Sequence, residues 1–107
     1  MEGLHSIQWR DCALSSSVEL PAGDKLILNV EYPQVPPGQA DRRCAIVFSG
    51  VHAHEVKEMP VPGRPTLVDA ALVASGGGLH TLCIETSNGM RVVSARAVAL
   101  QPGWQFS

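Results

Sequence analysis

Three histidines and one glutamate have the types and spacing that could bind a metal ion. His52 and His54 are separated by one residue, so on a β-strand both imidazoles would project from the same face. Glu58 has the same parity if the strand continues that far, and His80 begins a later β-type run. Imidazole and carboxylate groups are common ligands of divalent transition metals. These four residues are therefore a candidate metal site, and the alternative is a set of strand histidines that bind nothing.

The same residues resemble the two metal-binding motifs of the cupin family, whose members are small β-barrels. Residues 52–58 (HAHEVKE) match the core of the first motif, and residues 77–80 (GGLH) match the Gly-x-x-His of the second. The sequence departs from the family pattern at Ile46 and Pro65, which stand where the family has glycine. The resemblance implies a small barrel with one divalent transition metal held by His52, His54, Glu58 and His80. Outside this alternative we expect no cofactor.

The elements that would position these residues are β-strands joined by short turns. Residues 66–74, 79–86 and 90–100 are β-type runs, separated by SGGG at 75–78 and SNG at 87–89. Short glycine-containing turns between such runs predict antiparallel hairpins. Within 90–100 the apolar parity changes, which predicts either a bulge near Ser94 or burial on both faces.

Five further β-type runs precede these hairpins, at residues 4–14, 18–20, 25–32, 42–48 and 51–57. The run 25–32 alternates most clearly, so we expect a core face of Leu26, Leu28, Val30 and Tyr32 and a solvent face of Lys25, Asn29 and Glu31. Apolar residues nowhere recur at helical spacing over ten residues. The sequence predicts an all-β fold, an antiparallel two-sheet sandwich or jelly roll of about eight strands, with a small cupin-like barrel as the alternative.

Composition narrows the classes of protein to which the chain can belong. We expect one domain over residues 1–107, able to bury roughly 65% of its unfolded surface. A net charge of −2 argues against a nucleic-acid partner, and Arg42, Arg43, Arg91 and Arg96 lack interleaved aromatics. The chain has neither a run of about 20 apolar residues nor the features of a signal peptide. We therefore expect no membrane partner and a cytoplasmic or virion location.

Cysteines and catalytic templates add little evidence for an enzyme. Cys12, Cys44 and Cys83 lie in β-type runs without close metal-type spacing, so we expect three buried, free thiols. The sequence has no Gly-x-Ser-x-Gly elbow of a hydrolase. A non-catalytic protein is the favoured interpretation.

The segment 101–107 carries two of the five aromatics, Trp104 and Phe106, beyond the breaker Pro102-Gly103. Either this tail folds back onto its own sandwich, or a neighbouring subunit receives the two rings as anchors. The proline-rich loop 33–41 could present a second, semi-rigid arm. We therefore predict a partner-binding surface that comprises Trp104, Phe106, Pro36 and Pro37.

Together these features predict a non-catalytic interaction module. We expect a small structural or accessory subunit of a larger assembly, such as a virion decoration protein, whose partner is a second copy or another assembly protein. One alternative is a carbohydrate-binding module with Trp9, Tyr32 and Trp104 as stacking platforms. The other alternative is the cupin-like metal-binding protein.

Overall fold

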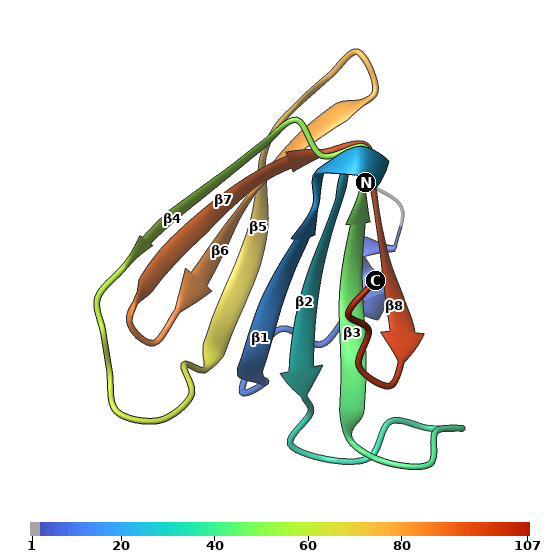
Figure 1. The fold of residues 1–107 in the computed structure, drawn as a ribbon, viewed down its shortest axis with the longest axis vertical. Coiled ribbons are helices and arrows are strands. Elements are labelled where there is room, and N and C mark those ends of the chain that lie inside the picture. The colour runs from blue at the N-terminus through green and yellow to red at the C-terminus, as the bar shows by residue number, and fades with distance from the viewer. Residues whose placement is uncertain (1–2) are drawn as a thin grey trace.

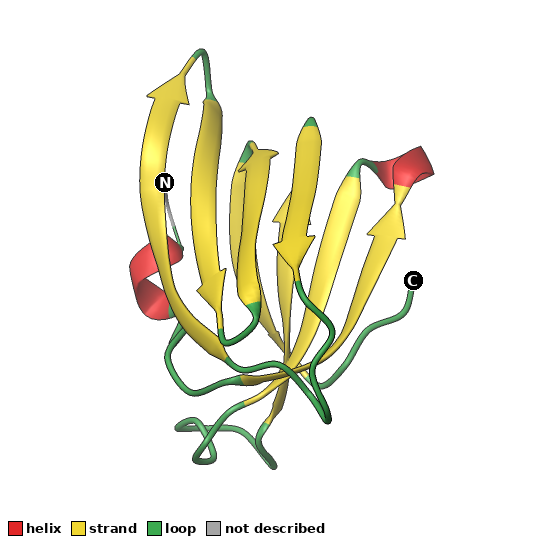
Figure 2. Ribbon diagram, turned by 90° about the vertical axis from the view of Figure 1, so that its left-hand side faces the viewer, coloured by secondary structure: helices red, strands yellow, loops and turns green. Residues whose placement is uncertain are grey.

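The computed structural model describes residues 3–107, which form two four-stranded antiparallel sheets (Figure 1). Sheet A has the strand order β1-β2-β3-β8, and sheet B has the order β4-β7-β6-β5. The strands are β1 (Ala13–Leu20), β2 (Lys25–Glu31), β3 (Arg43–Ser49), β4 (Ala53–Glu58), β5 (Leu67–Gly76), β6 (Leu79–Thr86), β7 (Gly89–Ala95) and β8 (Ala97–Pro102). Two short 3-10 turns, η1 (Leu4–Ser6) and η2 (Pro21–Gly23), appear red in Figure 2. The predicted eight-stranded sandwich is confirmed.

The two sheets are separate layers rather than one closed barrel. A single β-bridge, Ala13 to Thr66, connects the start of β1 to the residue before β5. Apolar residues of both inner faces form the core, among them Leu28, Ile46, Phe48, Leu82 and Ile84, which are fully buried. Alternate residues along each strand point inward, and the packing of the two apolar faces against each other produces the two-layer arrangement. The barrel alternative is therefore not the architecture of this chain.

The apolar segment before β1 closes the core without forming a strand. Residues 4–14 were expected to be extended, but the chain forms η1 and then an irregular stretch up to β1. Gly3 and Asp11 have positive φ values of 88° and 67°, which interrupt an extended backbone. Trp9 is buried against Phe48, with ring centroids 6.4 Å apart. The predicted strand is wrong, because these apolar residues cover the core instead of pairing.

The parity change within residues 90–100 marks a crossing between the sheets, not a bulge. β7 ends at Ala95 in sheet B, and β8 begins at Ala97 in sheet A. Arg96 lies between them and donates its backbone N–H to the carbonyl of Ser49 at 3.0 Å. Ser94 pairs regularly with Thr81 and Ala53. The chain therefore changes sheet at Arg96, and each half keeps its own inner face.

Both predicted glycine turns are confirmed, and Gly89 is the more restrictive position. Its φ is +151°, and a Cβ atom there would lie 2.0 Å from the carbonyl oxygen of Lys57 on β4. Gly89→Ala should destabilise the protein by about 2 kcal/mol and lower its melting temperature by roughly 10 °C in a thermal circular-dichroism scan. Gly76→Ala is the matched control, because nothing lies within 4 Å of its Cβ position. Equal melting temperatures for the two variants would contradict this account of Gly89.

Within the described part of the chain, no helix is long and apolar enough to span a bilayer.

Candidate functional site

The four residues of the predicted metal site lie in different surroundings. His54 and Glu58 share the inner face of β4, as their parity predicts, whereas His52 precedes the strand and is exposed. His80 lies on β6, where its Nδ1 forms a hydrogen bond with the hydroxyl of Ser75. Across residues 3–107, no group of three or more His, Cys, Asp or Glu side chains is arranged to hold a metal ion. Metal binding therefore stays a prediction that gains no support from this arrangement.

His54 connects the two sheets through an acidic partner. Its Nδ1 lies 2.6 Å from Oε1 of Glu19 on β1, and its side chain is only 7% exposed. An ionised carboxylate only accepts hydrogen bonds, so Nδ1 carries the proton. Nε2 is buried and has no hydrogen-bond partner among residues 3–107. This imidazole therefore holds β1 against β4, and its second nitrogen is not accessible to a substrate.

A pocket of about 280 Å³ lies between η2 and the start of β4. Glu19, Asp24, His52 and His54 are among the residues that line it. Two carboxylates and two imidazoles would suit a cationic ligand, but the Glu19–His54 contact already uses one group of each kind. The pocket is therefore a polar opening at the edge of the sandwich, in which Asp24 and His52 lie beside the Glu19–His54 contact.

Glu58 is paired with an arginine. Arg91 on β7 donates from Nε to Oε2 of Glu58 at 3.0 Å and from a terminal nitrogen to Oε1 at 2.9 Å. Both side chains are 10% exposed, and Thr86 donates its hydroxyl to Oε2 at 3.1 Å. The hydrogen bonds from Arg91 hold the pKa of Glu58 below its ordinary value of 4.5. This ion pair was not predicted from the sequence, although Arg91 lies on the same face of β7 as the apolar residues Val93 and Ala95.

The segment 103–107 folds back onto the outer face of sheet A, as Figure 1 shows. Asn29 on β2 accepts a hydrogen bond from the backbone N–H of Gln105 at 2.9 Å and donates one to its carbonyl at 2.7 Å. Trp104 donates its indole N–H to the carbonyl of Val30 at 2.8 Å. Asn29 was expected to face solvent, but it is fully buried. The expectation is wrong because this tail satisfies and covers the amide.

The predicted partner-binding residues differ in how much surface they present. Trp104 is half-buried against sheet A of its own chain, and the guanidinium of Arg43 lies 5.7 Å from its ring centroid. Phe106 is 62% exposed. Pro36 is half-buried and Pro37 exposed, and both line a pocket of about 400 Å³. Because Arg43 directly follows the proline loop, the loop and the tail lie at the same end of sheet A.

The residues proposed as sugar platforms are mostly inside the protein. Trp9 is 7% exposed and Tyr32 is 5% exposed, so neither presents a ring face to solvent. The hydroxyl of Tyr32 accepts a hydrogen bond from the backbone N–H of Gln8 at 3.1 Å. Trp104 is the one member of the predicted set with an accessible edge, and a stacking surface of several rings does not form.

All three cysteines are free thiols, as predicted. Cys12 and Cys44 are buried, and burial raises the pKa of Cys12 to about 12 and also raises the pKa of Cys44. Cys83 is only partly buried and lies in β6, whereas Cys12 precedes β1 and is not in a strand. The predicted burial therefore holds for two of the three thiols.

These features define an all-β sandwich whose inward-facing charged groups are paired with one another and whose tail is pinned to sheet A. No protein-family model matches the chain, and no curated protein matches it significantly. Its function therefore has to be inferred from its own residues.

Proposed function

We propose that this chain is a non-catalytic interaction module, a small structural or accessory subunit that binds another protein of a larger assembly. The observation that carries this proposal is the exposure of Phe106, which is 62% accessible although Gln105 beside it is held by two hydrogen bonds to Asn29. An apolar anchor on an ordered backbone loses little conformational freedom when a partner binds. Aromatic side chains are frequent anchors of protein interfaces.

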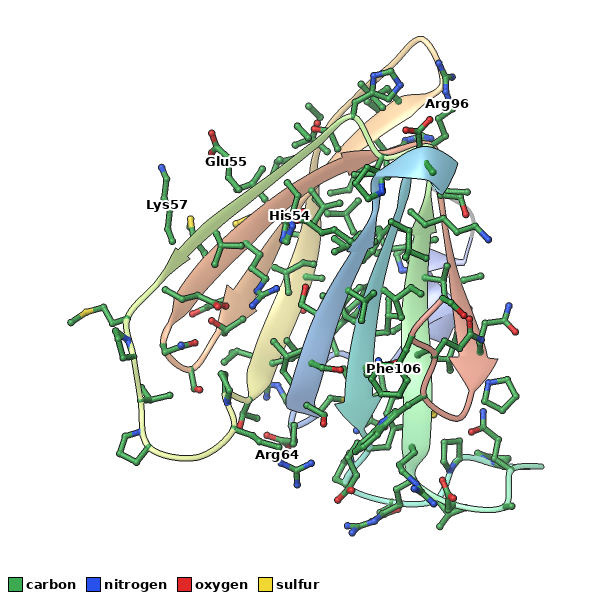
Figure 3. All side chains as sticks on the ribbon, viewed as in Figure 1. His54, Glu55, Lys57, Arg64, Arg96 and Phe106 are labelled. Atoms are coloured by element: carbon green, nitrogen blue, oxygen red, sulfur yellow. The ribbon has the colours of Figure 1, made fainter. Side chains whose placement is uncertain are left out.

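Further exposed apolar residues support the same proposal. We define the tail surface as Trp104, Phe106, Pro36 and Pro37, together with Val35, which precedes Pro36 in the proline loop and is 52% exposed. Phe106 is labelled in Figure 3, where the tail crosses the strands of sheet A. Prolines hold the loop extended at a low entropic cost. One such assembly is a virion, in which the chain would decorate the shell, and the same surface would serve in a cytoplasmic complex.

A non-catalytic role is supported by how the polar groups of the interior are used. Glu58 is bonded to Arg91, and His54 to Glu19, so these groups stabilise the sandwich. A carbohydrate-binding role has less support, because Trp9 and Tyr32 are buried.

The proposal is tested by isolating a tagged chain from the cells that produce it. We expect the wild-type chain to elute in a complex that contains another protein, and Phe106→Ala to elute without that protein while its melting temperature stays unchanged. Val73→Ala is the matched control, because Val73 is 59% exposed but lies on β5 of sheet B. It should retain the complex. A wild-type chain that elutes free of other proteins, or a complex that survives Phe106→Ala, would overturn the proposal.

A further inference from the structure

The edge of sheet B formed by β4 has backbone groups that no other strand pairs within the part of the chain that the structure describes. β4 contacts only β7 within its sheet and lies at the sheet's outer side (Figure 1). Just past its end, Met59 donates its N–H to the carbonyl of Asn88 at 2.9 Å. Hydrogen bonding alternates along an antiparallel pair, so Ala53, Glu55 and Lys57 bond to β7. The N–H and C=O groups of His54, Val56 and Glu58 therefore point outward, away from the sheet.

β4 is also a regular edge from Ala53 to Glu58, although just before it the N–H of His52 donates to the carbonyl of Ser94, the residue opposite Ala53, at 2.8 Å. Its pairing with β7 has no register shift, whereas the pairings of β1 and β5 are each interrupted by bulges. Bulges discourage one sheet edge from pairing with another. β8, the fourth edge strand, ends in Pro102, which has no N–H to donate. β4 is thus the edge strand of this chain best suited to receive a further strand.

The side chains of β4 carry a short charge pattern around an exposed apolar residue. Glu55 and Lys57 are exposed, and Figure 3 shows both pointing away from the sandwich. Val56 lies between them on the opposite face and is 48% exposed, and Met59, just past the strand, is 74% exposed. The edge therefore combines unpaired backbone groups, apolar surface and two opposite charges.

We propose that β4 pairs antiparallel with β4 of a second copy of this chain, about a two-fold axis at Val56. The two B sheets would then form one continuous eight-stranded sheet. Val56 lies opposite the partner's Val56, and His54 lies opposite the partner's Glu58. These are the residues whose backbone groups point outward, so each finds a hydrogen-bond partner in this register. The exposed Val56 side chains cover each other on the inner face.

The charge pattern selects a second copy in this one register. Glu55 lies opposite the partner's Lys57, at a non-hydrogen-bonded position where side chains approach most closely. A shift of two residues in one direction places Glu55 opposite the partner's Glu55. The opposite shift places Lys57 opposite the partner's Lys57, and like charges directly opposite are destabilising. A lysine alone on an edge strand disfavours pairing with another copy. Glu55 and Lys57 have opposite charges, so each lies opposite its complement when the second copy runs antiparallel.

The expected dimer is weak and sensitive to salt. β4 contributes six residues per subunit, compared with about 20–30 in a standard interface. The ion pairs are exposed, so added salt screens them. The proposal goes beyond the function proposed above, because the tail surface lies on sheet A and stays free in the dimer.

Sedimentation equilibrium at low salt, from about 10 µM to about 1 mM chain, tests this pairing. We expect the average mass to rise from 11.4 kDa toward twice that value. Lys57→Glu makes positions 55 and 57 both acidic and Glu55→Lys makes them both basic, so each variant alone should associate at least tenfold more weakly. An equimolar mixture of the two should regain association, because every opposing pair then has opposite charges. Lys25→Glu, the same charge change at an exposed residue of β2, should associate as the wild type does.

Three results would overturn the proposal. They are a wild-type chain that stays monomeric over the whole range, association that survives Lys57→Glu, and a mixture of the two variants that stays monomeric. Thermal melting of each variant checks that it is folded, and we expect no change because both substituted side chains are exposed.

Discussion

Replacing Glu58 by alanine should lower the melting temperature by roughly 15 °C or more. The substitution removes the carboxylate partner of Arg91, whose side chain is 10% exposed in the wild-type structure. Removing one partner of a buried ion pair typically costs about 3–5 kcal/mol, and each kcal/mol shifts the midpoint of a domain of this size by roughly 4–8 °C. Differential scanning calorimetry at pH 7 measures the shift directly.

The double variant Glu58→Leu/Arg91→Met is the control for this prediction. It removes both charges and replaces them with apolar side chains, so it should recover more than half of the lost stability. If the double variant melts no higher than Glu58→Ala, the loss of stability would come from the packing of the two side chains rather than from the unpaired charge of Arg91.

The same carboxylate gives a pH dependence with a definite sign. The pKa of Glu58 is lowered in the folded protein from its ordinary value of 4.5, so the unfolded chain binds its proton more readily. The stabilisation is fully present above about pH 4.5 and is lost as the pH falls below that value toward the folded pKa. Urea unfolding at pH 7 and at pH 3 measures how much unfolding free energy each protein loses on acidification. We expect Glu58→Ala to lose less than the wild type. An equal loss in both proteins would contradict this assignment.

Removing residues 103–107 should lower the melting temperature by roughly 12 °C or more. A cut after Pro102 keeps β8 intact but removes the two hydrogen bonds between Gln105 and Asn29 and exposes the Asn29 side chain, which is fully buried in the intact chain, to water. It also removes the half-buried Trp104 ring, whose indole N–H donates to the carbonyl of Val30 at 2.8 Å. Together these losses amount to about 3 kcal/mol. Thermal circular dichroism measures the change, and Phe106→Ala should melt within about 2 °C of the wild type.

A double-mutant cycle separates the bracing contact from general damage. Asn29→Ala removes the same two hydrogen bonds from the other side, so the combination of this substitution with the truncation should cost clearly less than the sum of the two single changes. Fully additive losses would mean that the tail stabilises sheet A through other contacts.

The sequence allowed the strands of sheet A to be placed, but not everything that covers them. Alternation correctly assigned Leu26, Leu28 and Val30 to the core. The same alternation assigned Asn29 to solvent, because it tells which face of the strand a residue occupies but not what covers that face. The tail that covers Asn29 arrives 76 residues later in the chain. Such a long-range contact leaves no periodic trace near residue 29.

The alternation of side chains along a strand also predicted part of the candidate site. It placed His54 and Glu58 on one face of β4, which the structure confirms. Their roles depend on Glu19 and Arg91, which belong to other strands and are brought close by the packing of the sheets and by the register of β4 with β7. The residue types along one strand reveal neither the contact of His54 with Glu19 nor that of Glu58 with Arg91. The sequence therefore predicts His54 and Glu58 as metal ligands.

The position of β8 next to β3 has a consequence for the newly synthesised chain. Residues 44–48 of β3 are all buried and carry no charge, and one side of this strand pairs with β8, which is made after the other seven described strands. Until residues 97–102 are available, sheet A consists of three strands with an uncharged, unpaired edge. Edges of this kind recruit other chains when exposed during folding. Slower production of the chain at lower temperature should therefore raise the soluble yield, because fewer incomplete sheets coexist at any time.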